Sequence, residues 1–147
     1  MNTSRIIALL TFFIAHTGFT QDAEKLRLAL ITCGDRQSDF LFEISKAKMG
    51  TLPKWHPESD SPAPVSLKRA YELGRTGLKN RYPDIDEFEV GMVRISEVIS
   101  TERHGTWFYE VNYIGKRDGK PVGSCGLFAV ILMDGTSVEP VVTRKNP

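Results

Sequence analysis

The stretch SLKRAYELGRTGLKNRYP, residues 66–83, has the pattern of one amphipathic helix. Ser66 is a favourable N-cap residue, and Pro83 ends the helix after Tyr82. Apolar and small side chains recur at spacings of three and four residues and form one stripe: Leu67, Ala70, Tyr71, Gly74 and Leu78. The stripe predicts a helix packed against a sheet, and its glycine predicts a close approach of the two backbones.

The opposite face of this helix is basic. Lys68, Arg69, Arg75 and Lys79 lie on it, and Glu72 is the single acidic residue among them. A solvated helix surface is the expected interpretation, and a surface that receives an acidic partner is the alternative.

The segment after Pro83 has the pattern of β structure. Residues 88–99 are rich in Val and Ile, residues 102–105 form a turn, and residues 106–114 form the next strand. Four side chains of that second strand share one face: Trp107, Tyr109, Val111 and Tyr113. We expect them beneath the helix stripe, which needs such a surface, and an exposed aromatic platform is the alternative.

Three further features continue the sheet. Residues 117–120, Arg-Asp-Gly-Lys, form a turn, and residues 127–133 are apolar on both faces, as expected of a central strand or of one covered on both sides. Asp134 and Gly135 form a strong hairpin signal that leads to a last strand at 136–143. Pro140 places this last strand at an edge or a bulge, because proline has no N–H to donate.

The chain before the helix is less regular. Phe40, Phe42 and Ile44 alternate with other residues, which predicts a half-buried strand over residues 40–49. Residues 26–33 are apolar but fit a helix as well as a strand, so their structure stays open. Four prolines make residues 50–64 an irregular loop, in which Trp55 and His56 either pack on the domain or bind a partner.

The order of these elements predicts an α+β domain, with one helix packed across a four- to five-stranded antiparallel meander sheet. We expect a single domain over residues 40–147, with the Pro-rich loop at 50–64. A segment of uncertain structure precedes it at 21–39.

Residues 1–20 have the three-part layout of a secretory signal peptide. Arg5 gives a positive start, an apolar run follows, and small residues precede the polar stretch from Gln21. The run from Ile6 to Phe19 is fourteen residues long, shorter than the roughly 20 that a membrane-spanning helix needs. We therefore expect a secreted or periplasmic chain with no stable membrane span after the signal is removed.

The charge balance limits the classes of partner. The chain has 19 basic and 18 acidic residues, and removal of Arg5 with the signal leaves 18 of each. Affinity for nucleic acids depends on uncompensated Lys and Arg, so no nucleic-acid partner is expected. Anionic membrane surfaces are disfavoured for the same reason.

Cys33 and Cys125 are the two cysteines of the chain. In an exported protein a disulfide between them is one interpretation, and two separate buried thiols are the other. A bridge would close a loop of roughly 90 residues and stabilise the fold by about 4 kcal/mol on the chain-entropy model.

Two motifs follow the capped helix: HGTWFYEV at 104–111 and FAVILMDGTSVEP at 128–140. With them, residues 66–140 resemble the small PepSY-type module, whose members end with a W-x-Y-E-V strand and a hairpin that turns on Asp and Gly. The resemblance implies an exported or membrane-attached, non-enzymatic protein that binds or inhibits partners, peptidases among them. The strand at 40–49 and the Pro-rich loop are additions to that pattern.

With the additional strand, the order of elements is also similar to the cystatin-like layout, in which a sheet wraps one helix. Inhibitory cystatins insert a Gln-x-Val-x-Gly hairpin and a Pro-Trp hairpin into a cysteine-protease cleft. The corresponding turns here, residues 100–105 and 134–135, lack both motifs. The likeness therefore concerns the fold alone.

The remaining chemical groups do not form a recognisable catalytic or metal site. His56 and His104 are the only imidazoles after the signal, and no metal-ligand spacing joins them to Glu58, Asp60 or Glu102. We expect both histidines in loops, exposed to water.

The spacing of residues in two other segments excludes a catalytic nucleophile turn in one and a calcium-binding EF-hand in the other. Residues 123–126, Gly-Ser-Cys-Gly, depart from the Gly-x-Ser-x-Gly nucleophile turn. Residues 84–89 are acidic but lack the glycine that a calcium-binding EF-hand needs at its sixth position. We expect no catalytic residues, no metal and no cofactor.

The functional hypothesis from the sequence is a non-catalytic binding module for a protein or peptide, including an inhibitory domain. Its expected contact residues are Trp55 and His56 in the loop, with Val138 and Val142 on the last strand, because edge strands accept added strands. One alternative is a small ligand-binding or enzymatic cone with a pocket between helix and sheet. A structural envelope subunit is another, and the oligomeric state stays open.

Overall fold

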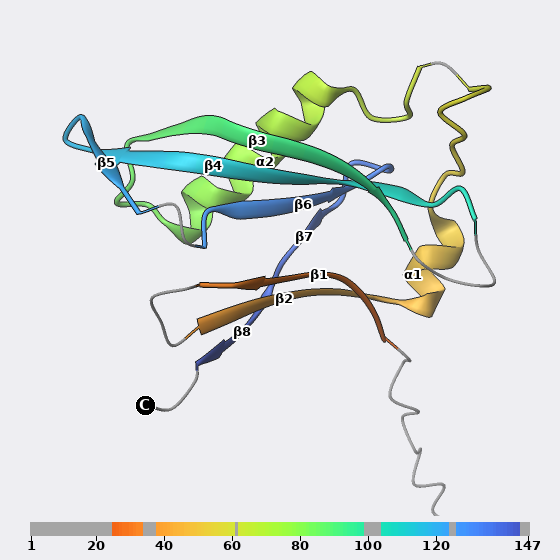
Figure 1. The fold of residues 1–147 in the computed structure, drawn as a ribbon, viewed down its shortest axis with the longest axis horizontal. Helices are drawn as coiled ribbons and strands as arrows, with labels where there is room; N and C mark the ends of the chain where they lie inside the picture. The colour runs from red at the N-terminus through yellow and green to blue at the C-terminus, as the bar shows by residue number, and fades with distance from the viewer. Residues whose placement is uncertain (1–24, 34–37, 61, 99–103, 124–125, 145–147) are drawn as a thin grey trace, which may run out of the picture.

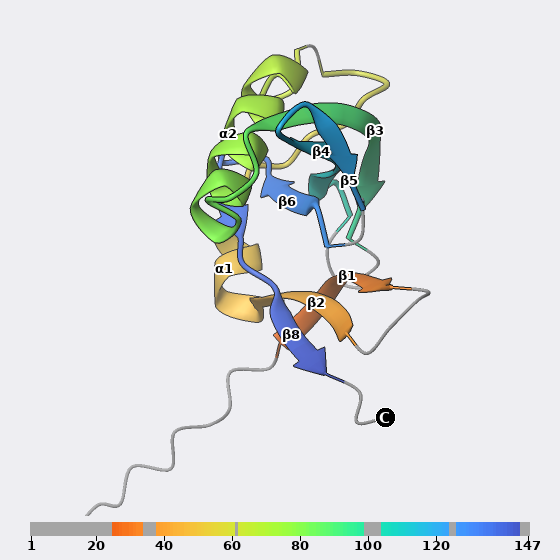
Figure 2. The same cartoon turned by 90° about the vertical axis from the view of Figure 1, so that its left-hand side faces the viewer.

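The computed structural model describes residues 25–33, 38–60, 62–98, 104–123 and 126–144. The predicted signal peptide, residues 1–20, lies outside them. The described residues form three layers: one long helix, a five-stranded sheet and a three-stranded sheet (Figure 1). The helix and the small sheet cover opposite faces of the large sheet, as the end view also shows (Figure 2).

The large sheet is an antiparallel meander. Its strands are β3 (Glu87–Glu97), β4 (Trp107–Arg117), β6 (Phe128–Leu132) and β7 (Ser137–Val138), in the order β3-β4-β6-β7, and β5 (Lys120–Val122) pairs with β4. Asp118 and Gly119 have positive φ angles of 50° and 71° in the turn between β4 and β5. Two such residues are what a two-residue hairpin turn requires. The predicted α+β class and the turn at 117–120 are confirmed.

The long helix, α2 (Leu67–Arg81), begins and ends where its sequence predicts. The Ser66 hydroxyl accepts a 3.2 Å hydrogen bond from the backbone N–H of Arg69, and Tyr82 is the C-cap. Ala70, Gly74 and Leu78 are its buried residues. The helix packs chiefly on β6, with smaller contacts to β4 and β7.

The small sheet contains β1 (Lys25–Thr32), β2 (Ser38–Ser45) and β8 (Val141–Arg144), in the order β1-β2-β8. The segment at 26–33 that the sequence left open is therefore a strand, paired antiparallel with β2. The predicted strand at 136–143 is wrong as one element. It divides at Pro140 into β7 and β8, which belong to different sheets, because proline cannot continue a hydrogen-bonded ladder.

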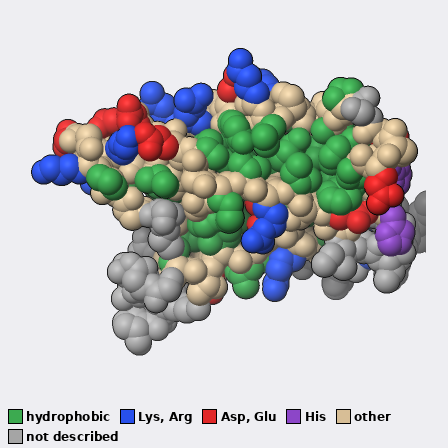
Figure 3. All heavy atoms as spheres, turned by 45° about the horizontal axis from the view of Figure 1, so that its top comes forward, with side chains coloured by type: hydrophobic (Ala, Val, Ile, Leu, Met, Phe, Trp, Pro, Cys, Tyr) green, Lys and Arg blue, Asp and Glu red, His purple; other side chains and the backbone are tan. Residues whose placement is uncertain are grey.

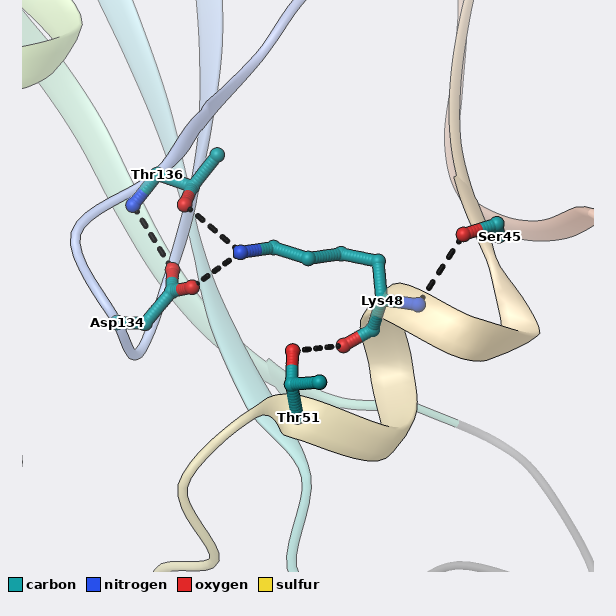
Figure 4. Close-up of polar contacts among 5 residues, drawn as sticks. All are labelled: Ser45, Lys48, Thr51, Asp134 and Thr136. Carbon is teal, nitrogen blue, oxygen red and sulfur yellow. Dashed lines mark hydrogen bonds and ion pairs between the residues drawn. The ribbon is translucent and has the colours of Figure 1, made fainter.

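The predicted strand at 40–49 is also too long. It ends at Ser45, whose hydroxyl accepts a 3.1 Å hydrogen bond from the N–H of Lys48 and so caps a short helix, α1 (Lys46–Thr51). The ammonium of Lys48 pairs with the Asp134 carboxylate and lies 3.1 Å from the Thr136 hydroxyl (Figure 4). These contacts hold α1 against the turn between β6 and β7.

Two hydrophobic cores lie on the two faces of the large sheet. Tyr109, Val111 and Tyr113 of β4 belong to the core beneath α2, whereas Phe108 belongs to the core between the sheets. β6 contributes to both: Ala129 and Ile131 to the first core, Val130 and Leu132 to the second. This double burial explains why residues 127–133 are apolar on both faces, as predicted for a central strand.

Cys33 is disulfide-bonded, while Cys125 lies outside the described residues. Across the described ranges, no helix has the length and apolar character that a membrane crossing requires.

Candidate functional site

The outer strand β3 presents an apolar face that α2 does not cover. Val90, Val93 and Ile95 lie opposite Tyr113, Val111 and Tyr109 of β4. Residues directly opposite each other in an antiparallel pair project to the same face, so the three aliphatic side chains are on the helix side of the sheet. Because α2 packs chiefly on β6, Val90 and Ile95 remain 41% and 42% exposed.

One ridge of α2 runs beside this strand. Residues four apart on a helix are neighbours on its surface, so Leu67, Tyr71, Arg75 and Lys79 form one row. Arg75 and Lys79 line a hollow of about 580 Å³ together with residues 86–89 at the start of β3. We call this hollow, together with the helix-side face of Val90, Val93 and Ile95 farther along β3, the α2–β3 groove.

Figure 3 looks onto this side of the molecule. Hydrophobic side chains run across its centre. Lys and Arg side chains lie along the upper margin, with a group of Asp and Glu side chains among them at the left, and histidine lies at the far right end beside acidic side chains. The groove thus combines an apolar floor with a charged end.

The carboxylates at the charged end already have partners. Lys116 lies 3.5 Å from Glu87 and pairs more closely with Glu89. The hydrogen bond to Glu89 raises the pKa of Lys116. The Asp86 carboxylate accepts a 2.7 Å hydrogen bond from the backbone N–H of Asp118.

The two cations on the helix wall, unlike the carboxylates of Glu87 and Glu89, have no side-chain partner of opposite charge among the described residues. Within the part of the chain that the structure describes, neither Arg75 nor Lys79 forms an ion pair. Both side chains are exposed. In the hollow, the helix wall therefore carries two exposed cations, and the strand wall carries the carboxylates of Asp86, Glu87 and Glu89.

The loop residue Trp55 packs onto the domain. Its ring meets the Trp107 ring edge-on at a centroid distance of 5.8 Å, and its backbone N–H donates a 2.9 Å hydrogen bond to Gly105. The indole N–H donates to the carbonyl of Asp60 at 3.1 Å. Trp55 is partly buried and extends the core beneath α2, so its role as a partner contact stays a prediction.

The other predicted loop contact, His56, is exposed and covers Gly105. A Cβ on Gly105 would lie 2.8 Å from the His56 ring, and Gly105 has a φ of +81°, so only glycine fits there. His56 and His104 line a second hollow of about 450 Å³ with Glu58, Ser59, Glu97 and Trp107.

The second hollow does not bring together a set of metal ligands. Glu97 accepts a 2.6 Å hydrogen bond from the N–H of Gly105, and this contact stabilises the backbone just before β4. No cluster of three or more His, Cys, Asp or Glu side chains suited to a metal ion occurs among the described residues. The hollow joins the two imidazoles in space, which their separation in sequence did not indicate.

The two valines predicted as contacts differ in exposure. Val138 is 7% exposed and packs in the core between the sheets, so its side chain is not offered to a partner, and that expectation is corrected. The cause is its register: Val138 lies opposite Val130 of β6, and both side chains project into the core between the sheets. Val142 is 48% exposed on β8, an outer strand of the small sheet, and stays a candidate contact.

The space between helix and sheet is filled. The hydroxyls of Tyr109 and Tyr113 donate 2.8 Å hydrogen bonds to the carbonyls of Val65 and Tyr71. Burial raises the pKa of both phenols, that of Tyr113 to about 12. The predicted position of these aromatic residues beneath the helix is confirmed.

The groove was not predicted from the sequence. Residues 88–99 were predicted as a strand of the meander, but whether the strand at 40–49 joins the same sheet depends on distant pairing, so the outer position of β3 was not readable locally. The local signal that could have suggested an edge strand is Gly91, which lies at the irregularity in register between Val90 and Met92.

The α2–β3 groove thus belongs to an α+β domain built from a meander sheet, one covering helix and a second sheet. Comparisons with family models, curated proteins and solved structures find no match.

Proposed function

We propose that this chain is an exported, non-catalytic binding module that holds a protein or peptide segment in the α2–β3 groove. The observation that carries the proposal is the exposure of Val90 and Ile95 on the outer strand β3. Burial of such side chains by a partner contributes about 25 cal/mol per Å² of apolar area. The predicted signal peptide supports export.

The geometry suits addition of a strand. β3 pairs with β4 on one side and, within the described residues, has no strand on its other side. Outer strands of this kind receive extended peptides through main-chain hydrogen bonds, while pockets beside them select side chains. Here α2 provides the second wall, which a flat sheet edge lacks.

The alternative with a reaction pocket between helix and sheet has less support. The side chains in that layer, Tyr109 and Tyr113, donate their hydroxyl protons to backbone carbonyls and hold the helix in place. A groove outside the helix remains open to a partner, and the carboxylates that line it accept hydrogen bonds or ion pairs from Lys116 and from the N–H of Asp118.

The test uses a random dodecapeptide library displayed on phage and selected against the chain from residue 21 onward. Selected peptides are then measured against the variant Val90→Lys/Ile95→Lys. The matched control is Val141→Lys/Val142→Lys on β8, because these two side chains are exposed to a similar degree, 51% and 48%. Unchanged thermal unfolding of both variants shows that the fold is retained.

We expect the β3 variant to weaken binding by more than about tenfold, since it removes buried apolar area and adds two charges to the interface. The β8 variant should bind normally. Equal binding by the β3 variant, or loss confined to the β8 variant, would place the binding surface elsewhere.

A further inference from the structure

We infer that the segment held in the α2–β3 groove inserts a basic side chain, the ammonium of Lys or the guanidinium of Arg, into the second hollow at the far end of β3. This inference rests on the proposed function and names the chemistry of the partner. It depends on the register of β3 and on the side chains that line the second hollow.

The second hollow continues the helix-side face of β3. Glu97 lies directly opposite Trp107 at the end of the β3–β4 pair, in the same alternation as Ile95 and Tyr109. Glu97 therefore projects to the same face as Ile95. Both Glu97 and Trp107 line the second hollow, and Figure 3 shows histidine and acidic side chains at the right end of the apolar strip. A partner that runs along β3 thus reaches this hollow without leaving the sheet edge.

The register of β3 determines which residue of the partner meets the hollow. Pairing with β4 is regular over residues 92–97 and shifts just before them. Because such an irregularity bends the strand, an added strand would align with residues 92–97. Partner side chains opposite Val93, Ile95 and Glu97 would share the helix side, since alternate residues of a strand project to one face. Read in the direction of β3, the expected partner pattern is apolar, any residue, apolar, any residue, then Lys or Arg.

The second hollow has an excess of negative charge. Glu58 and Glu97 line it, and none of its lining residues in the described part of the chain is Lys or Arg. Neither carboxylate forms an ion pair within the described ranges. The Asp60 carboxylate lies beside the hollow, where it accepts a 2.8 Å hydrogen bond from the N–H of His56.

The cation next to this hollow does not form an ion pair with these carboxylates. Lys54 donates hydrogen bonds of 2.7 Å to the His104 carbonyl and 2.9 Å to the Thr106 hydroxyl, which are both uncharged acceptors. Among the described residues that line the hollow or bond to its lining, three carboxylates therefore stand against one ammonium. The electrostatic complement of this site is a cation.

The indole of Trp107 suits the apolar stem of a basic side chain. Trp107 is partly exposed but its N–H is buried, so the ring presents carbon rather than a donor to the hollow. Lys and Arg pack their methylene groups on apolar surface, and the face of an indole attracts a cation. His56 and His104 add ring nitrogens that accept hydrogen bonds when the imidazoles are neutral. An ammonium or guanidinium therefore matches both the charge and the aromatic wall.

The size of the effect follows from exposure. Glu58 is exposed and Glu97 is partly buried, so removal of both charges should weaken binding by about five- to tenfold. Because exposed charges are screened, the difference should shrink as salt concentration rises. Removal of the partner's cation should weaken binding to a similar extent. The two changes should not add, because both remove the same interaction.

The test repeats the phage selection of dodecapeptides on the variant Glu58→Gln/Glu97→Gln. Glutamine keeps a side-chain oxygen that accepts the N–H of Gly105, and unchanged thermal unfolding verifies the fold. The matched control is Glu43→Gln/Glu139→Gln, which changes the net charge equally on β2 and after β7, at the opposite edge of the large sheet from β3.

Each selected peptide is also measured with its basic residue replaced by glutamine. For the unaltered chain and the control we expect Lys or Arg two positions beyond the last apolar residue, and about five- to tenfold weaker binding of the glutamine peptide. For Glu58→Gln/Glu97→Gln we expect no preference for a basic residue and equal binding of the two peptides.

The outcomes separate the two proposals. Selected peptides that lose binding with Val90→Lys/Ile95→Lys but carry no basic residue at this position would overturn this inference and leave the binding function intact. A basic preference that persists in Glu58→Gln/Glu97→Gln, or an equal loss in the control, would also overturn it. Failure to select any peptide that depends on β3 would contradict the proposed function itself, and this inference with it.

Discussion

The hydroxyl of Tyr113 lies directly beneath Gly74 of α2 and donates a 2.8 Å hydrogen bond to the carbonyl of Tyr71. A Cβ at Gly74 would collide with that hydroxyl and lie 2.9 Å from the Cβ of Ala129 on β6. The glycine therefore lets the helix settle onto β4 and β6. This position of the helix leaves the helix-side face of β3 uncovered.

Replacement of Gly74 by alanine should destabilise the protein even though alanine is the better helix former. Overpacking of a closely packed contact costs about 1–3 kcal/mol, which exceeds the gain in helix propensity. Gly77→Ala is the matched control, because its Cβ would lie 3.3 Å from the Ser137 hydroxyl, which can rotate away. Urea unfolding measures both, and equal stability of the two variants would contradict the close approach.

Replacement of Tyr113 by phenylalanine should lower the free energy of unfolding by about 1 kcal/mol, because it removes one buried hydrogen bond. Burial raises the pKa of Tyr113 from 10.0 to about 12, so folding favours the protonated phenol. The contribution of the protonated Tyr113 phenol to the free energy of unfolding is therefore complete below pH 10 and is lost as the pH rises toward 12.

Ultraviolet absorbance of tyrosinate measures this titration. The Tyr113→Phe variant should lack the last step of the native titration curve. A native chain in which every tyrosine ionises near the ordinary value would contradict the burial of Tyr113.

The helix α2 and the central strand β6 could be predicted from the sequence, because caps and the spacing of apolar side chains determine them locally. The Ser66 cap and the stripe through Gly74 placed α2, and the double apolar pattern placed β6 between two cores. In contrast, the small sheet depends on pairing between β2 and β8, which are far apart in the chain. Periodicity does not encode such pairing, so the sheet change at Pro140 and the outer position of β3 were missed.

The contact between Lys48 and Asp134 should make the attachment of α1 sensitive to acid (Figure 4). Burial alone would raise the pKa of Asp134, but hydrogen bonds from Lys48 and Thr136 outweigh it and hold the pKa below the ordinary value of 3.8. The stability from the ionised group is present above pH 3.8 and is lost as the pH falls through the lowered pKa.

The variant Asp134→Asn should be less stable than the unaltered chain at neutral pH and should lose less stability on acidification. Urea unfolding across the acid range measures the difference. Glu58→Gln is the control, because Glu58 is exposed in the Pro-rich loop. Parallel pH profiles for the unaltered chain and Asp134→Asn would contradict the assigned contact.

We predict that the disulfide of Cys33 is formed with Cys125. Peptide mapping without reductant should recover one linked pair that contains both cysteines. On the chain-entropy model, reduction should lower the free energy of unfolding by about 4 kcal/mol. Recovery of Cys33 linked to a second copy of the chain would contradict the intramolecular bridge.

The most direct test of the central claim is NMR mapping of amide chemical shifts while a phage-selected peptide is titrated into the protein. The account predicts that the largest changes fall on β3 and on the row of α2 that contains Tyr71 and Arg75, with β8 unaffected. Changes confined to β8 or to the loop around Trp55, with β3 unchanged, would contradict a partner site in the α2–β3 groove.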